Sequence, residues 1–156
     1  MEKVLAEIRS NHERYLEEMK ELLRIPSISP GTPHPEAITE AANWIEARLK
    51  KAGMEEVEQL TAEGHNPVVV GRKHISDDLP TILFYGHYDV MPPDPVDLWE
   101  TPPFEPTIKD GTIIGRGTAD DKGQALMHLF AVEAYLKVNG TLPVNAVFCL
   151  EGEEEM

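Results

Sequence analysis

Apolar residues recur every three or four positions in three stretches of the chain, which is the spacing of an amphipathic helix. The first stretch covers 2–24, and the prolines of 25–35 cannot continue it. The second begins at Pro35, a residue suited to the first helical position, and ends near Gly53. The third covers 121–138. The pattern therefore predicts three helices.

Two longer apolar runs alternate with these helices. The run at 80–90 is nearly continuous, as expected for a strand buried on both faces, and 143–150 reads as the next buried strand. Shorter strands are expected at 56–60 and 66–73. Because a helix connects the two longer strands, we expect them to be parallel neighbours in one sheet of an α/β fold.

The segment between the first long strand and the third helix is irregular in pattern. Residues 91–106 hold six prolines and predict a long loop of the kind that is usually functional. Residues 110–117 predict a short extended segment between glycine turns.

Three polar clusters fall at equivalent places in this predicted topology. "GHYD" (86–89) and "EGEEE" (151–155) each end a long strand, and "TADDKG" (118–123) opens the connecting helix. In open α/β sheets, ligands bind outside the carboxyl ends of the strands. The three clusters can therefore converge on one edge of the sheet.

Each cluster has an ordinary interpretation beside a functional one. His87 and Asp89 point to the same side of an extended chain, as a metal ligand and its orienting carboxylate do, although a turn is the commoner use of such a pair. Helix capping explains one of the two aspartates Asp120 and Asp121, but not both. The closing glutamates resemble a solvated tail, yet they directly follow a buried strand.

Together the clusters favour a mixed imidazole and carboxylate metal site. This donor set suits Zn²⁺, Co²⁺ or Mn²⁺ better than Cu(I). A carboxylate that bridges two metal ions is typical of hydrolytic sites, and a free glutamate beside it can act as a general base. Neighbouring residues of an extended chain point opposite ways, so Glu154 and Glu155 can have different roles. Nothing in the sequence connects the loop residue His65 with this site.

The charge and composition of the chain indicate which classes of binding partner are unfavourable. The 28 acidic residues outnumber the 14 basic ones and give a net charge of −14, which disfavours nucleic acid and anionic membrane surfaces. The one cysteine allows no internal disulfide, and the charged first twenty residues do not resemble a signal peptide. We therefore expect a cytoplasmic protein.

The ordered set of motifs resembles the M20 family of metallopeptidases, which includes dipeptidases, carboxypeptidases and N-acyl-amino-acid deacylases. The resemblance implies a three-layer α/β/α domain with a mostly parallel sheet, of which 1–156 would be the N-terminal part. An inserted domain for dimerisation, and a C-terminal part with further Asp and His ligands, would lie outside these residues. The matching stretches are "ELLRIPSIS" (21–29), "YGHYDVMPP" (85–93), "LWETPPFEPTIKDG" (98–111), "GRGTADDKG" (115–123) and "EGEEE" (151–155).

The same resemblance implies two metal ions, with zinc as the first expectation and Co²⁺ or Mn²⁺ as alternatives. His87 would bind one ion and Glu155 the other. Asp120 would bridge both, and its peptide bond to Asp121 would be cis.

Two further roles follow from the family. Asp89 would hold the imidazole ring, and Glu154 would be the general base that activates water. A shift by one residue, to Glu153 and Glu154, stays open because the three glutamates are contiguous.

The function implied is hydrolysis of dipeptides, in a full-length protein that is a homodimer. An N-acyl-amino-acid deacylase uses the same mechanism and is the first alternative. A non-catalytic α/β module is the second.

Overall fold

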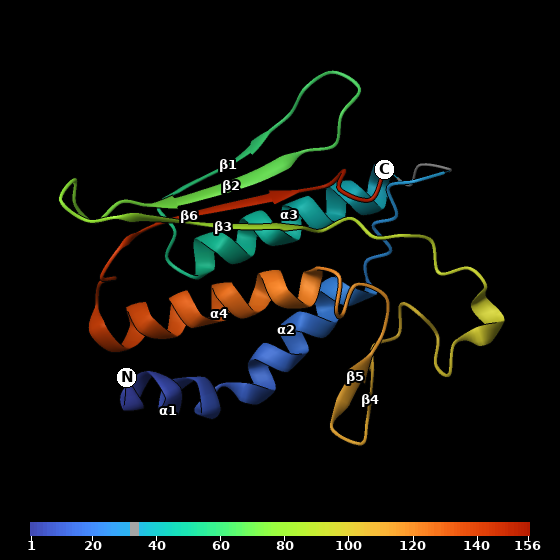
Figure 1. The fold of residues 1–156 in the computed structure, drawn as a ribbon, viewed down its shortest axis with the longest axis horizontal. Helices are drawn as coiled ribbons and strands as arrows, with labels where there is room; N and C mark the ends of the chain where they lie inside the picture. Colours follow the sequence, from blue (N-terminus) through green and yellow to red (C-terminus); the bar gives the residue numbers. More distant parts are fainter. Residues whose placement is uncertain (32–34) are drawn as a thin grey trace.

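A computed structural model describes residues 1–31 and 35–156; residues 32–34, in the predicted proline-rich segment, lie outside the described residues. Figure 1 shows a sheet with helices packed along it. The elements are α1 (Glu2–Ser10), α2 (His12–Arg24), α3 (Pro35–Lys51), β1 (Glu56–Leu60), β2 (Val68–Lys73), β3 (Thr81–His87), the 3₁₀ helix η1 (Val96–Leu98), β4 (Thr107–Lys109), β5 (Thr112–Ile114), α4 (Lys122–Asn139) and β6 (Asn145–Glu151).

The main sheet has the strand order β1–β2–β6–β3. β3 and β6 are parallel, as the crossover through α4 predicts, whereas the β1–β2 and β2–β6 pairs are antiparallel. The α/β class is thus confirmed, but the expectation of a mostly parallel sheet is wrong for the described residues. The reason is that the connections 61–67 and 74–80 are short, whereas a parallel return needs a dozen or more residues, so β2 runs opposite to β1 and to the β3–β6 pair.

All helices of the described residues lie on one side of this sheet, with α3 against β1 and β2 and α4 against β3 (Figure 1). The described residues therefore form two of the three layers that are expected for the whole domain. β3 is an edge strand whose outer face has no helix in the described residues, so Leu83 and Tyr85 are 61% and 54% exposed. The expectation that this strand is buried on both faces is corrected accordingly.

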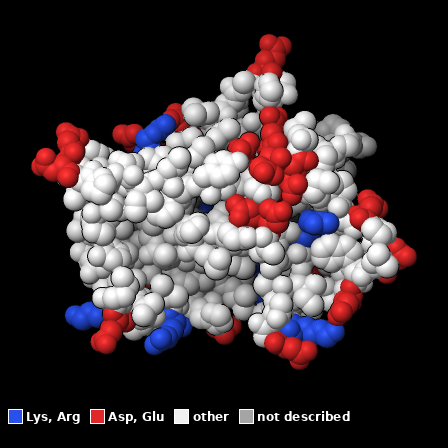
Figure 2. Space-filling view, viewed as in Figure 1, with Lys and Arg blue, Asp and Glu red and all other residues white. Residues whose placement is uncertain are grey.

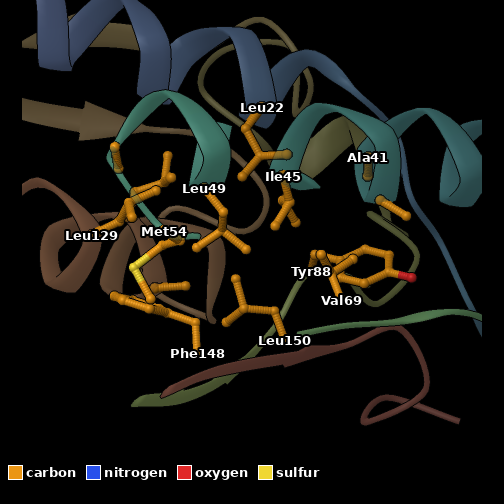
Figure 3. Packing of buried hydrophobic residues seen from close by; sticks show 14 of the residues in the cluster. Leu22, Ala41, Ile45, Leu49, Met54, Val69, Tyr88, Leu129, Phe148 and Leu150 are labelled. Atoms are coloured by element: carbon orange, nitrogen blue, oxygen red, sulfur yellow. The ribbon is translucent and has the colours of Figure 1, made fainter. Parts of the chain in front are cut away.

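The core fills the space between the sheet and the helices (Figure 3). Leu49 of α3, Leu129 of α4 and Phe148 of β6 are at most 2% exposed. Burial of each such side chain contributes about 1.5–3 kcal/mol. Gly71 of β2 allows α3 to approach, because a Cβ at this position would lie 3.2 Å from Leu49 Cδ1. The core thus fixes the sheet whose carboxyl edge carries the polar clusters.

The helix predicted over 2–24 is divided into α1 and α2 at Asn11. The Asn11 side chain donates a hydrogen bond from Nδ2 to the carbonyl oxygen of Glu7 at 2.9 Å. Such a side chain competes with the backbone for a helical acceptor, which explains the local departure from helical geometry. Apolar periodicity alone does not reveal this break.

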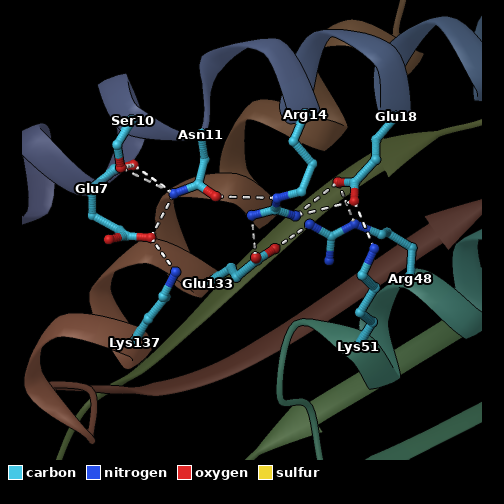
Figure 4. Close-up of polar contacts among 9 residues, drawn as sticks. All are labelled: Glu7, Ser10, Asn11, Arg14, Glu18, Arg48, Lys51, Glu133 and Lys137. Atoms are coloured by element: carbon cyan, nitrogen blue, oxygen red, sulfur yellow. Dashed lines mark hydrogen bonds and ion pairs between the residues drawn. The ribbon is translucent and has the colours of Figure 1, made fainter.

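An ion-pair network joins α2, α3 and α4 (Figure 4). The buried carboxylate of Glu18 accepts hydrogen bonds from Arg14 at 3.0 Å, Arg48 at 2.9 Å and Lys51 at 2.8 Å. Glu133 of α4 pairs with both arginines. The network therefore links three helices that cover the sheet.

We expect Glu18→Gln to lower the free energy of unfolding by about 2 kcal/mol at pH 7, because buried Arg48 loses one of its two anionic partners and must then share Glu133 with Arg14. Burial raises the pKa of Glu18, but the hydrogen bond from Lys51 and the charge of Arg48 outweigh it, so the net pKa is lowered. Stability from this carboxylate is thus present above the ordinary pKa of 4.5 and is lost as the pH falls through the lowered value. Urea unfolding at pH 7 and at lower pH measures both effects.

The matched control is Glu17→Gln, which removes an exposed carboxylate paired with Lys20 on the same helix. Exposed pairs contribute about 0–1 kcal/mol, so this variant should unfold almost as the unaltered protein does. Equal losses in the two variants would contradict the structural role of Glu18.

The connections between β3 and α4 largely follow the predictions made from the sequence. Residues 91–106 are irregular apart from η1, and 112–114 of the predicted extended segment form β5, which pairs with β4. The turn between β4 and β5 contains Asp110 and Gly111, both with positive φ. Within residues 1–31 and 35–156, every helix is too short or too polar to cross a membrane.

Candidate metal centre

The three polar clusters meet at one edge of the sheet. β3 ends at His87, which lies opposite Glu151 at the end of β6, and Asp120 and Asp121 immediately precede α4. Acidic side chains gather where β3 and β6 end on the face shown in Figure 2. The parallel crossover thus produces the convergence that the sequence predicted.

His87 lies at the centre of this group. Its Nε2 atom is 3.0 Å from Asp120 Oδ1 and 4.0 Å from Glu154 Oε2. Glu155 completes a set in which one ligand atom each from His87, Asp120 and Glu155 lies within 4.8 Å of the others. The imidazole is only 6% exposed, whereas the carboxylates of Asp120 and Glu154 are open to solvent. A buried nitrogen and accessible oxygens therefore face one point.

The other ring nitrogen of His87 determines which tautomer is favoured. Nδ1 lies 3.1 Å from the backbone carbonyl oxygen of Asp89 and 3.4 Å from Asp89 Oδ1. A carbonyl oxygen can only accept, so Nδ1 carries a proton, and in the neutral ring Nε2 then has the lone pair that a metal ion requires; in the protonated ring Nε2 donates to Asp120. The ring is held by the backbone of Asp89 as well as by its carboxylate, a contact that the motif alone does not indicate.

The carboxylate of Asp89 also holds the loop after β6. This side chain is fully buried, and it accepts hydrogen bonds from the backbone N–H of Glu154 at 3.3 Å and of Glu155 at 3.0 Å. Asp89 therefore connects the loop that carries two of the acidic side chains to the end of β3.

Glu153 is directed elsewhere, toward the loop between β1 and β2. Its carboxylate accepts a hydrogen bond from the backbone N–H of Asn66 at 2.7 Å and lies 3.0 Å from His65 Nδ1. These two contacts lower the pKa of Glu153. The geometry thus favours the register in which Glu154 and Glu155 face His87. The contact of His65 with Glu153 could not be predicted from local sequence patterns, because the two residues are 88 positions apart and lie in two loops.

The side chain of Asp121 does not cap α4, although helix capping was one interpretation of the two aspartates. It occupies the N-cap position of α4 but forms no side-chain capping hydrogen bond. Its Oδ2 instead accepts a hydrogen bond from the backbone N–H of His87 at 3.2 Å. A Cβ on Gly86 would lie 2.5 Å from this oxygen, so glycine is required for the approach. The expected cis peptide bond between Asp120 and Asp121 is present.

Like charges dominate the electrostatics of the group. Burial and the negative charge of Asp120 raise the pKa of Glu155. For His87, burial lowers the pKa, but hydrogen bonds to Asp89 and Asp120 outweigh burial, so the net pKa is raised. Both shifts show that positive charge is favoured at this point, and a bound cation would supply it.

The family model of peptidase family M20/M25/M40 matches residues 83–156. The cysteinylglycine-S-conjugate dipeptidase of Corynebacterium striatum is 35% identical over 146 residues, which cover 94% of this chain and 32% of that protein. The succinyl-diaminopimelate desuccinylase of Dechloromonas aromatica is 45% identical over 76 residues, covering 49% of this chain and 20% of that protein.

The comparison with solved structures also finds similarity to a dipeptidase. The crystal structure of human carnosine dipeptidase 1 matches with a TM-score of 0.90 at 29% identity, over 97% of this chain and 34% of that one. The chain thus spans about a third of the length of the dipeptidases it matches. The family model matches residues 83–156, while the Corynebacterium dipeptidase and the human structure match 94% and 97% of this chain, so the resemblance to peptidase family M20 is confirmed.

Proposed function

We propose that this chain supplies part of the catalytic centre of a dipeptidase, with His87, Asp120 and Glu155 as ligands of two divalent metal ions. The observation that carries the proposal is the meeting of these three side chains, whose ligand atoms lie within 4.8 Å of one another. Asp120 is the proposed bridge between the two ions. Membership of a metallopeptidase family implies a divalent metal, and the donor set fits one.

The fit rests on the chemistry of the donors. One imidazole nitrogen and several carboxylate oxygens suit Zn²⁺, with Co²⁺ and Mn²⁺ as alternatives. Within the described residues, Asp120 and Glu155 form no ion pair with a lysine or arginine, so their charges are available to a cation. When bound, the metal ions would polarise the scissile carbonyl and make water more acidic.

The proposed general base is Glu154. Its carboxylate is exposed and lies beside the ligand group, while its backbone N–H is fixed by Asp89. In hydrolysis, Glu154 would take a proton from the attacking water and return it to the leaving amine, as one positioned carboxylate can do. Asp89 would keep both the His87 ring and the glutamate loop in place for this transfer.

Dipeptides are the proposed substrates because two relatives that match at least 94% of this chain are named dipeptidases. The similarity to a desuccinylase favours an N-acyl-amino-acid deacylase as the second candidate. Both reactions cleave an amide bond, and the residues of this chain serve either one.

The test is a metal-reconstitution assay of the purified full-length protein. After removal of metal with a chelator, Zn²⁺, Co²⁺ or Mn²⁺ is added back, and hydrolysis of Cys-Gly, β-Ala-His and N-acyl amino acids is followed. We expect metal-dependent cleavage of dipeptides. Cleavage of acylated amino acids alone would support the deacylase, and metal binding without any cleavage would support a non-catalytic module.

The wider context rests on the family resemblance. We propose that residues 1–156 are the N-terminal part of the catalytic domain of a cytoplasmic homodimer, with no nucleic-acid or membrane partner. Size-exclusion chromatography with light scattering measures the oligomeric state.

A further inference from the structure

The segment that follows α2 runs directly behind the candidate metal centre. Ile28 and Val90 form a parallel β-bridge, and the backbone N–H of Val90 donates to the carbonyl oxygen of Ser27 at 2.9 Å. The Ser27 hydroxyl in turn donates to the carbonyl oxygen of Tyr88 at 2.6 Å. Residues 27–29 therefore lie against residues 88–90, which continue from the histidine-bearing strand β3.

Ser29 makes a contact of a different kind, with a side chain of the site. Its hydroxyl donates to Asp89 Oδ2 at 2.5 Å, and both residues are buried. The same oxygen accepts from the Glu155 backbone, while Oδ1 accepts from the Glu154 backbone and lies 3.4 Å from His87 Nδ1. Within the described residues, Ser29 is thus the hydroxyl donor that fixes the carboxylate on which the ring and the glutamate loop both depend.

We propose that Ser29 is a positioning residue, which sets the rotation of the Asp89 carboxylate and through it the spacing between His87 and Glu155. The inference rests on the proposed metal function of these two side chains. A carboxylate has a broad range of rotation about its last torsion, and both backbone donors to Asp89 come from the same loop, the one whose position the carboxylate would set. The hydroxyl behind Asp89 completes the donor set and holds one orientation.

The segment that carries Ser29 is itself fixed from the other side of the site. Lys122, a fully buried residue at the start of α4, donates from Nζ to the carbonyl oxygens of Leu22 at 3.1 Å and Ile25 at 2.7 Å. Lys122 follows Asp120 and Asp121 in the chain. Lys122 therefore connects the end of α2 to the segment that carries the two aspartates. Because Ser29 follows α2 closely in the chain, this connection also helps to hold Ser29 in place beside Asp89.

The test compares Ser29→Ala with Ser27→Ala, a matched control two residues away. Both serines are buried and lose a hydroxyl that donates one hydrogen bond, but Ser27 bonds a backbone carbonyl rather than Asp89. Metal affinity is measured by competition with a chelator, and ligand geometry by the visible spectrum of the Co²⁺-loaded protein. Steady-state kinetics then separate kcat from KM.

We expect Ser29→Ala to bind metal up to about tenfold more weakly, because loss of a residue that orients a ligand directly costs about 10–100-fold and Ser29 acts one step behind such a residue. Its Co²⁺ spectrum should change, and kcat should fall with little change in KM. Ser27→Ala should lower the melting temperature by about 2–4 °C and leave metal affinity and spectrum unchanged. Ser29→Thr, which keeps the hydroxyl, should restore the affinity.

Equal metal affinity and spectrum in the two alanine variants would overturn the proposal for Ser29 while leaving the metal site itself intact. Absence of metal binding in the unaltered protein would overturn the proposed function and this inference with it. If Ser29→Ala does not fold, Ser29→Cys and Ser27→Cys replace the pair, because a thiol keeps the volume but is a weaker donor.

Discussion

Replacement of Glu154 by glutamine is expected to leave the metal content unchanged and to lower kcat about a thousandfold. Glutamine has the shape of glutamate, and the backbone N–H that Asp89 holds is unaffected by the change. The amide cannot accept a proton from water, and a positioned general base contributes about 10²–10⁴ in rate. Metal analysis and initial rates with a dipeptide, measured on the same preparation, separate the two effects.

The matched control is Glu153→Gln. Glu153 is the neighbouring glutamate, and its contacts with Asn66 and His65 place it outside the ligand group. We expect this variant to keep most of its turnover, with some loss of stability in the loop after β6. A thousandfold loss in Glu153→Gln together with near-normal turnover in Glu154→Gln would mean that the register is shifted by one residue and the base is Glu153.

The convergence of the site could be predicted because it depends on topology. A strand, a helix and a second strand in sequence bring "GHYD" and "EGEEE" to the same sheet edge, whatever the details of packing. Residues 118–123 join them because they open the connecting helix. The choice of His87, Asp120 and Glu155 within these clusters came from the family resemblance, and the structure brings their ligand atoms within 4.8 Å of one another.

The contacts that orient these side chains could not be predicted, because each joins distant parts of the chain. Ser29 and Asp89 are 60 residues apart, and Asn66 and Glu153 are 87 apart. A serine in a proline-rich segment gives no signal of such a bond. Asp121 lies at the N-cap position, where capping is the expected role, and the sequence does not indicate that its carboxylate instead accepts a hydrogen bond from the backbone of His87.

The arrangement of layers was also beyond the sequence pattern. The apolar run at 80–90 is typical of a strand covered on both faces, but β3 lies at the sheet edge with Leu83 and Tyr85 exposed. Hydrophobicity indicates that a face can be buried, and it does not indicate which segment covers it. The antiparallel position of β2 between β1 and β6 depends on the short connections 61–67 and 74–80, which allow the chain to reverse but which no motif specifies.

The number of metal ions lost on substitution should distinguish a bridging ligand from a terminal one. We expect the protein to bind two ions, His87→Ala and Glu155→Ala to keep one each, and Asp120→Ala to keep neither. The reason is that a carboxylate shared by two ions holds both in place, and its loss also exposes each ion to the charge of the other. Equilibrium dialysis at metal concentrations just above those of the protein gives the stoichiometry.

Thermal unfolding gives an independent measure of the same difference, since a ligand that binds only the folded state stabilises it by an amount set by its free concentration and its Kd. Zn²⁺ should therefore raise the melting temperature of the unaltered protein and have almost no effect on Asp120→Ala. Asp78→Ala, which removes an exposed aspartate in the loop before β3, at the opposite end of that strand from His87, should respond as the unaltered protein does. Retention of one ion by Asp120→Ala would mean that Asp120 binds a single metal, and the two ions would then have to be held without a shared carboxylate from this residue.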